Sequence, residues 1–278
     1  MTIISAYAAP HPPIILPEVG KGQEKEIQAT IDGFREAARR FNEDQADTVV
    51  IISPHAAMYS DYFSISPGTG AGGDMSRFGA KGPRTVVEYD SEFARSLGAA
   101  ASGKGIAAGF AGERDSTLDH GCVVPLRFFQ ETWDRFRAVR IGISGFPTAA
   151  HYELGRLIAR VSAELNRRTV IIASGDLSHR LKSDGPYGYA PEGPEFDRQV
   201  MACLGAGDFL ALTRVPEKLR EAAGECGWRA FVMMAGAFDG REVEAEKLSY
   251  EGPFGVGYGV CAFKGGNFDE SRSFGGLI

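Results

Sequence analysis

The chain has 278 residues, of which 44% are hydrophobic, and its 30 basic and 36 acidic side chains give a net charge of −6. This length suits one large α/β domain or two small ones. The sequence contains no run of Lys and Arg that would follow the phosphates of a nucleic acid or an anionic membrane surface. We therefore expect no nucleic acid and no membrane as a partner.

The sequence has no apolar stretch near the roughly 20 residues of a membrane helix, and its first residues lack the features of a secretory signal. A cytoplasmic location is therefore expected. The cysteines form no CxxC pair, which predicts reduced, mainly structural side chains instead of a disulfide framework or a zinc ribbon. They are Cys122, Cys203, Cys226 and Cys261.

The predicted elements begin with a strand–helix–strand unit. β-type runs at residues 2–8 and 48–53 flank residues 24–41, whose apolar positions have helical spacing. The same order recurs at residues 138–144, 152–166 and 169–174. Further helices are predicted at 195–212, 216–223 and 227–238, and strands at 242–250 and 255–263. The fold class is predicted as α/β, a mostly parallel central sheet flanked by helices, with antiparallel C-terminal edge strands.

Two glycine-containing segments, residues 68–82 and 182–194, are predicted as long loops, and the second one could cover a cleft. We find no internal repeat and no composition change that would divide the chain. Residues 1–264 are therefore predicted to form a single domain, and the Gly- and Ser-rich residues 265–278 a flexible C-terminal tail.

Four histidines lie in segments rich in turn-forming residues. His11 (APHPP), His55 (SPHA) and His179 (SGDLSH) follow β-branched runs, so they are expected at the carboxyl ends of strands, where open α/β sheets bind ligands. His120 (LDHG) precedes a strand-like run at 122–126. The fifth, His151, is predicted in the first turn of a surface helix, without a functional role.

A non-haem Fe(II) centre that activates dioxygen typically uses two histidines and one carboxylate. His11 and His55 are candidate ligands, and Glu225 is the chosen carboxylate because Gly224 and Gly227 flank it before an apolar helix. The alternatives are a turn role for His11, a loop or capping role for His55, and a helix N-terminal charge for Glu225. Glu251 is the competing carboxylate.

His179 and His120 are the candidate catalytic residues. Asp176 or Ser178 could orient the imidazole of His179 as a neutral base, or could instead cap a helix that begins there. His120 could donate a hydrogen bond to a substrate oxygen or to O2, and its alternative role is that of a turn residue.

Other catalytic patterns are absent from the sequence. It contains no GxSxG, GxxxxGK[ST] or HExxH motif. Gly68, Gly70 and Gly73 match GxGxxG, but no apolar helix can begin after them. Serine hydrolase, P-loop and dinucleotide-binding functions are therefore not expected.

The motifs APHPPIILPEVG, SPHA, LDHG, ASGDLSH and GECGW…GAFDG together resemble the LigB superfamily of class III extradiol ring-cleavage dioxygenases. The similarity is greatest to the branch of the AmmeMemoRadiSam system protein B, which includes Memo-like proteins, and it spans about residues 3 to 263. It implies His11, His55 and Glu225 as iron ligands, His179 as the acid/base residue and His120 as a histidine beside the substrate.

By this resemblance, the protein is expected to be an Fe(II)-dependent extradiol dioxygenase that opens the ring of a small aromatic diol, a catechol, with O2. The alternative is a Memo-like protein that binds a metal or a partner, such as a radical SAM enzyme, without oxygenase activity. In that branch a cysteine can replace the carboxylate, and Cys226 adjoins Glu225. A third function is a hydrolase with Zn(II) in the same site. The family and the exposed edge strands also make a homodimer an expectation.

Overall fold

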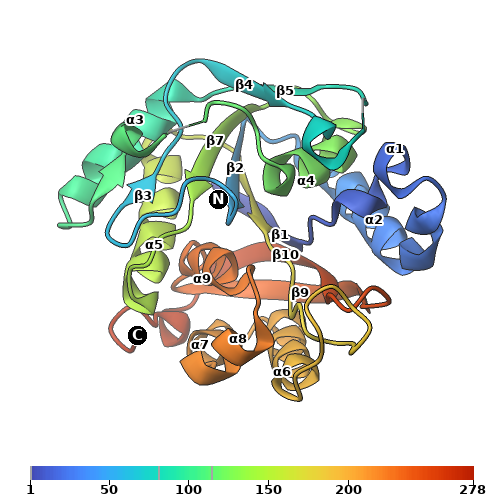
Figure 1. Cartoon of the computed structure of the whole chain (residues 1–278). Helices are drawn as coiled ribbons and strands as arrows, with labels where there is room; N and C mark the ends of the chain where they lie inside the picture. Colours follow the sequence, from blue (N-terminus) through green and yellow to red (C-terminus); the bar gives the residue numbers. More distant parts are fainter. Residues whose placement is uncertain (1, 81, 114) are drawn as a thin grey trace.

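The computed structural model describes residues 2–80, 82–113 and 115–278. Its main sheet has six strands in the order β7-β2-β8-β1-β10-β9 (Figure 1). The strands are β1 (Ile3–Ala9), β2 (Thr48–Ser53), β7 (Arg137–Gly142), β8 (Thr169–Ser174), β9 (Arg241–Glu251) and β10 (Tyr258–Phe268). β1, β2, β7 and β8 are parallel, and β10 and β9 complete the sheet in antiparallel orientation. The predicted fold class is therefore confirmed.

Helices cover both faces of this sheet. They are α1 (Pro17–Gly20), α2 (Gln28–Asp44), α3 (Ser91–Ser102), α4 (His120–Gln130), α5 (Thr148–Glu164), α6 (Glu192–Ala206), α7 (Phe209–Thr213), α8 (Glu217–Ala223) and α9 (Trp228–Gly236). In Figure 1, α3 and α5 lie on one side of the sheet and α2 and α4 on the other. Short strands β3 (Phe63–Ser64), β4 (Gly70–Gly73), β5 (Thr85–Glu88) and β6 (Ala108–Gly109) form two small additional sheets.

Side chains of the central strands alternate between the two faces, as the twofold periodicity of a strand requires. In β2, Val50 and Ile52 join the core that contains α5 and α9, whereas Val49 and Ile51 join the core beneath α2 and α4. All six residues of β2 are buried. Strands buried on both faces are typical of parallel sheets and explain the continuous apolar runs in the sequence.

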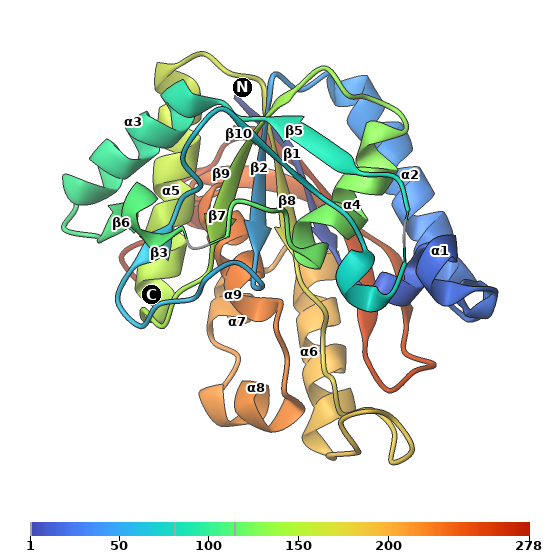
Figure 2. The same cartoon turned by 45° about the horizontal axis from the view of Figure 1, so that its top comes forward.

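The strand order determines which loops meet. β8 lies between β1 and β2, so the two strands of the first predicted unit are not neighbours. The parallel strands point the same way (Figure 2), and their carboxyl ends therefore share one edge of the sheet. The loops after β1, β2 and β8, which carry three of the five histidines, start side by side.

The strand-like prediction for residues 122–126 is wrong. These residues belong to α4, which begins at His120. The Asp119 carboxylate accepts a hydrogen bond from the backbone N–H of Cys122, as an N-cap residue does. This capping interaction prevails over the β propensity of the two valines at 123 and 124.

His151 also differs from its prediction. It lies in the first turn of α5 as expected, but its side chain is fully buried instead of exposed at the surface. Its Nδ1 contacts the Pro147 carbonyl oxygen at 3.2 Å, and its ring packs edge-on against Phe63. Because α5 packs against the sheet from its first turn, this histidine belongs to the core.

The predicted boundary of the C-terminal tail falls inside a strand. β10 continues to Phe268, beyond the predicted domain end at residue 264. After the strand, the Asp239 carboxylate accepts a hydrogen bond from the backbone N–H of Phe274 at 2.6 Å. The glycine content of this segment suggested a tail. Pairing with β9 nevertheless keeps Gly265 in the sheet. The glycine-rich residues 68–82 likewise contain β4, which pairs with β5.

The helices of the described residues are all too short or too polar to cross a membrane.

Asp197 of α6 anchors the segment that follows β8. Its carboxylate accepts hydrogen bonds from the backbone N–H of Ser178 at 2.7 Å and from the Tyr250 hydroxyl at 2.8 Å. Burial raises the pKa of Asp197 to about 7, although both hydrogen bonds oppose this shift. The segment that carries His179 is thus attached to a carboxyl group that titrates near neutral pH.

We expect the buried carboxyl of Asp197 to make the protein less stable as the pH rises from about 4 to about 7, and Asp197→Asn to remove this contribution. The pKa is 3.8 in the reference state and higher in the fold, so the folded state binds more protons between these values. The stabilisation is complete below the lower pKa and disappears as the pH passes the upper one. Urea unfolding of both proteins across this range measures it, and equal pH dependence would contradict the prediction.

Candidate functional site

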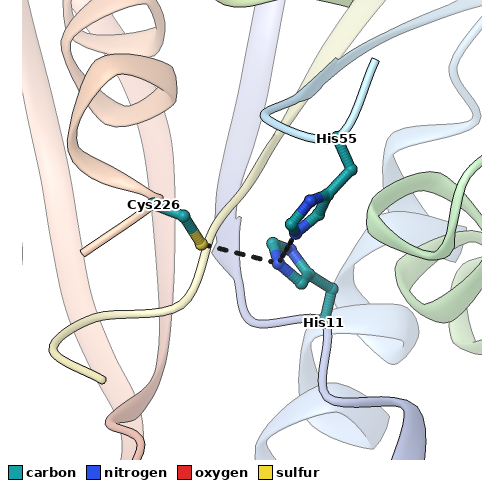
Figure 3. Close-up of side chains that lie close together, drawn as sticks. All are labelled: His11, His55 and Cys226. Carbon is teal, nitrogen blue, oxygen red and sulfur yellow. Dashed lines mark hydrogen bonds between the residues drawn. The ribbon is translucent and has the colours of Figure 1, made fainter. Parts of the chain in front are cut away.

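Three side chains from distant parts of the chain meet at the carboxyl edge of the sheet. His11 follows β1, His55 follows β2, and Cys226 precedes α9 (Figure 3). The Nε2 atoms of the two histidines are 2.9 Å apart, and the Cys226 Sγ lies 3.6 Å from Nε2 of His11. In the part of the chain that the structure describes, these residues form one of two groups whose donor atoms could hold a metal ion.

His11 is held by hydrogen bonds from two directions. Its backbone N–H donates to Asp176 at 2.8 Å, and its Nδ1 lies 2.9 Å from the Ser174 hydroxyl. The Ser174 hydroxyl donates its only proton to the Gly121 carbonyl oxygen at 2.5 Å. It must therefore accept a hydrogen bond from the Nδ1–H of His11. This tautomer leaves the lone pair of Nε2 directed at His55 and Cys226.

The Gly121 carbonyl is available to Ser174 for a reason visible in the sequence. In an α-helix the carbonyl of residue 121 would accept the N–H of residue 125, but position 125 of α4 is a proline. Pro125 has no N–H to donate. The carbonyl that it leaves without an intrahelical partner is the one that Ser174 uses.

His55 is supported by a chain of polar contacts. Its backbone N–H contacts the Ser53 hydroxyl at 3.2 Å, and that hydroxyl donates to Asp119 at 2.6 Å. The second oxygen of Asp119 accepts from Arg140 at 3.0 Å, so this half-buried carboxylate has a cationic partner. Gly121 packs directly against these contacts. A Cβ at this position would lie 2.5 Å from the Ser53 hydroxyl.

Cys226 reaches the site because two glycine backbones pack in direct contact. A Cβ at Gly175 would lie 2.0 Å from the Cα of Gly227, so neither position has room for a side chain. The backbone N–H of Gly227 donates to the Asp176 carbonyl at 3.0 Å, and the N–H of Asp176 contacts the Cys226 Sγ at 3.3 Å. These contacts place the thiol beside the residues that follow β8.

The two candidate carboxylates of the sequence analysis point elsewhere. The Glu225 carboxylate accepts from the backbone N–H of Trp228 at 2.7 Å, at the start of α9. The Glu251 carboxylate accepts from the N–H and hydroxyl of Thr30. Neither belongs to a metal-binding group of the described residues. The geometry thus differs from the prediction of Glu225 as third ligand and favours Cys226, which the sequence analysis kept as an alternative.

His120 and His179 lie next to this group. The ring centroids of His55 and His120 are 4.0 Å apart. His179 forms the second potential metal group with Asp176 and Cys226, within 4.8 Å. Among the described residues, hydrogen bonds to the ring nitrogens fix neither His120 nor His179. The structure therefore brings four of the five histidines together, two as candidate ligands and two beside them.

Burial dominates the electrostatics of the cluster. It lowers the pKa of His11 well below the usual value, lowers that of His55 as well, and lowers those of His120 and His179 to about 4. All four imidazoles are therefore neutral at pH 7 and have a lone pair to offer. Burial also raises the pKa of the Cys226 thiol and brings that of Asp176 to about 7.

Two of the three donor separations match those around a single metal ion, and all three lie within 4.8 Å. Around an ion with metal–nitrogen bonds of about 2.0–2.1 Å and a metal–sulfur bond of about 2.3 Å, two nitrogens lie about 2.9–3.4 Å apart and nitrogen and sulfur about 3.1–3.6 Å apart. The observed separations of 2.9 Å and 3.6 Å fall within these ranges. Two neutral imidazoles and a thiolate suit iron, copper or zinc.

A cavity of about 560 Å³ adjoins the histidines. His55 and His120 line it together with Phe78 of the loop after β4 and the buried Arg140 of β7. A volume of this size is typical of small-molecule sites. The arrangement can therefore hold a metal at one end and admit a small organic molecule beside two unprotonated histidines.

Some supporting residues were not identified from the sequence. Ser174 and Arg140 lie inside apolar strand patterns, where they read as ordinary strand positions. The sequence offers one indication of their role, which is that each is a polar residue within an apolar strand. A polar side chain in a core needs a hydrogen-bond partner. Their partners, Gly121 and Asp119, come from a different segment and could not be assigned before the fold was known.

The model of the family described as "Catalytic LigB subunit of aromatic ring-opening dioxygenase" matches residues 5–261. Protein CA_C1420 of Clostridium acetobutylicum is 34% identical over 279 residues, which cover 98% of this chain and 60% of that protein. The chain thus spans less than two thirds of the length of that relative.

The more distant relatives include a protein named as a dioxygenase and one named as a MEMO1 family protein. The 3,4-dihydroxyphenylacetate 2,3-dioxygenase of Escherichia coli is 27% identical, over 75% of this chain and 80% of that protein. The MEMO1 family protein MK0963 of Methanopyrus kandleri is also 27% identical, over 79% and 73%. A crystal structure of the uncharacterized protein JW3007 from Escherichia coli K12 has a TM-score of 0.62 at 17% identity and covers 93% of this chain and 99% of that one. It shares the fold.

We expect Ser174→Ala to weaken metal binding about 10- to 100-fold, the usual effect of removing a hydrogen-bond partner of a histidine ligand. The substitution releases Nδ1 of His11 and leaves the Gly121 carbonyl without its donor. Competition titration with a chromogenic zinc chelator measures the affinity. Ser249→Ala is the matched control, because Ser249 is also buried but its hydroxyl has no hydrogen-bond partner among the described residues. Equal affinities in both variants would contradict the prediction.

We expect the Co(II)-loaded protein to show a thiolate-to-metal absorption band in the near ultraviolet, because the geometry makes Cys226 the candidate third ligand. Cys226→Ser should abolish the band, whereas Glu225→Gln should retain it. The reverse pattern, with binding lost in Glu225→Gln and unchanged in Cys226→Ser, would restore the carboxylate as the ligand.

Proposed function

Because this chain belongs to the LigB family of aromatic ring-opening dioxygenases, we propose that it is a metal-dependent extradiol dioxygenase, with iron bound by His11, His55 and Cys226. The resemblance that the sequence motifs indicated is confirmed by the family match and by relatives named as dioxygenases and as a MEMO1 family protein. The proposed substrate is a small aromatic diol of the catechol type.

One observation carries this proposal. Beyond the candidate ligands, two further histidines adjoin them, with no hydrogen bond to their rings from any described residue and with pKa values of about 4. A purely structural metal site is closed by its ligands and has no use for such groups. Unprotonated histidines beside a metal are suited to proton transfer from a bound substrate.

Each residue then has a distinct task. The bound metal would supply Lewis-acid and redox chemistry. His179, neutral at pH 7, can accept the proton of a catechol hydroxyl. His120 lies in the cavity lining and can hydrogen-bond a substrate oxygen. Phe78 and the buried Leu118 of the cavity lining can limit the access of water to the ring.

The overall reaction requires no other reductant. Both atoms of O2 enter the product when one carbon–carbon bond beside the diol is cleaved, so a catechol and O2 give a hydroxymuconic semialdehyde. Oxygen uptake and ring-opened product should therefore appear in equal amounts.

A second function is favoured by the thiol. Cys226 stands where a carboxylate completes the oxygen-activating iron sites that use two histidines. A thiolate ligand favours softer metals, and the relative from Methanopyrus kandleri is named as a MEMO1 family protein. The second candidate is thus a Memo-like protein that binds a metal, or a partner such as a radical SAM enzyme, without opening a ring.

The test is anaerobic loading with Fe(II), followed by O2 and a panel of catechols. We expect oxygen uptake with a matching ring-opened chromophore. His55→Ala should lose both the metal and the activity, while His179→Ala should keep the metal and lose about 10²- to 10⁴-fold in rate, the contribution of a general base.

Three results would contradict the proposal. Bound iron without uptake for any catechol would favour the Memo-like function. Full activity in His179→Ala would exclude its role as base. Hydrolytic activity with Zn(II) in the absence of oxygen would indicate a zinc hydrolase in this site.

A further inference from the structure

The four clustered histidines are held in two different ways. Nδ1 of His11 is fixed by the Ser174 hydroxyl, and Nε2 atoms of His11 and His55 face each other. For His179 and His120, the described part of the chain makes no hydrogen bond to a ring nitrogen, and both rings pack against other aromatic rings. The orientation of these two imidazoles therefore depends on packing.

Each of the two rings is packed by an exposed aromatic residue from a loop. Tyr187, between β8 and α6, stacks on His179 with centroids 5.0 Å apart and an interplanar angle of 28°. Phe78, between β4 and β5, meets His120 edge-on at 5.0 Å. Tyr187 is 60% exposed and Phe78 41% exposed. Neither ring is needed to fill the core.

In both loops a glycine with positive φ follows the aromatic residue. Phe78 is followed by Gly79 and Tyr187 by Gly188, and both glycines have φ of +73° with open space around the position of a Cβ. This left-handed conformation is readily adopted by glycine and strained for most other residues. The chain can therefore reverse directly after each aromatic residue, which leaves the ring against its histidine while the loop returns to the surface.

We propose that Tyr187 and Phe78 are positioning residues, which hold the imidazoles of His179 and His120 toward the substrate. This inference rests on the proposed function, in which these histidines exchange a proton or a hydrogen bond with a catechol. A hydrogen bond from the protein would occupy a ring nitrogen that the reaction needs. An aromatic contact restrains the plane of the ring and leaves both nitrogens available.

The arrangement also fits an aromatic ligand. The residues that stack on the histidines stand at the exposed side of the site, and Phe78 lines the cavity next to His120. A planar ring that enters the cavity meets the Phe78 side chain and the rings of His55 and His120. Exposed aromatic side chains beside a cavity are typical of surfaces that bind ligands.

The first experiment measures orientation without catalysis. In the Zn(II)-loaded protein with ¹³C-labelled histidine, the ring resonance of His179 is assigned by its absence in His179→Ala. Stacking on Tyr187 shifts this resonance upfield. We expect Tyr187→Ala to move it downfield and Tyr187→Phe to leave it in place.

Tyr189 provides the matched control for this experiment. It is an exposed tyrosine of the same loop, two residues further on, and makes no ring contact with a histidine among the described residues. Tyr189→Ala should leave the His179 resonance unchanged. An unchanged resonance in Tyr187→Ala, or an equal shift in Tyr189→Ala, would overturn the proposal.

The second experiment measures turnover of a catechol by the Fe(II)-loaded protein. Misplacement of a catalytic group by about 1 Å can cost about 10²-fold, so we expect Tyr187→Ala to lower kcat at least about tenfold. KM should change less, Tyr187→Phe should retain kcat, and Tyr189→Ala should match the wild type. An increase in KM without a change in kcat in Tyr187→Ala would assign Tyr187 to substrate binding and overturn its positioning role.

The two experiments separate this inference from the proposed function. Absence of ring opening in the wild type would refute the function, while the resonance shift would still decide whether Tyr187 positions His179. Phe78→Ala should act in the same way on the resonance of His120, with Phe110→Ala, an exposed phenylalanine outside the site, as its control.

Discussion

The site depends on one hydrogen bond, from the Ser174 hydroxyl to the Gly121 carbonyl oxygen. This carbonyl lies in the first turn of α4, and it is free because Pro125 cannot donate to it. By donating its proton there, Ser174 must accept from Nδ1 of His11, which selects the tautomer with a free Nε2. A proline in one helix thus determines which nitrogen a histidine on another element presents to the candidate metal site. The contact also joins β8 to α4 at the edge of the sheet where the histidines meet.

The same edge explains why the side chain of Cys226, and not that of Glu225, lies beside the two histidines. Contact between Gly175 and Gly227 fixes the chain before α9 against the segment after β8. With Gly227 fixed, Cys226 is the residue whose side chain faces Asp176 and His11. Glu225 is one residue further from the contact, and its carboxylate caps the start of α9 instead. A backbone N–H at the start of a helix is a strong hydrogen-bond partner for a carboxylate. Glu225 therefore caps α9, while the adjacent Cys226 faces His11.

Much of this could be predicted from the sequence, and the exceptions have a common cause. The buried runs of β1, β2 and β8 gave the parallel sheet, and the position of His11, His55 and His179 after them gave the meeting point. The choice between Glu225 and Cys226 could not be made, because adjacent residues in a loop have no periodicity that fixes their direction. The start of α4 at His120 was missed because β-branched residues obscured the cap formed by Asp119. The partners of Ser174 and Arg140 required the strand order, which no local pattern contains.

The charge balance of the cluster suits a divalent cation. Burial leaves four neutral imidazoles around the site and disfavours both the thiolate of Cys226 and the carboxylate of Asp176. Two Nε2 atoms that face each other at 2.9 Å repel when both present lone pairs. Without an ion, a neutral His55 with its proton on Nε2 can donate a hydrogen bond to Nε2 of His11. A divalent ion satisfies both nitrogens at once, stabilises the thiolate and provides the counter-charge that a buried Asp176 requires. The hydrogen bond between the two imidazoles therefore keeps both nitrogens at a separation that a metal ion can use.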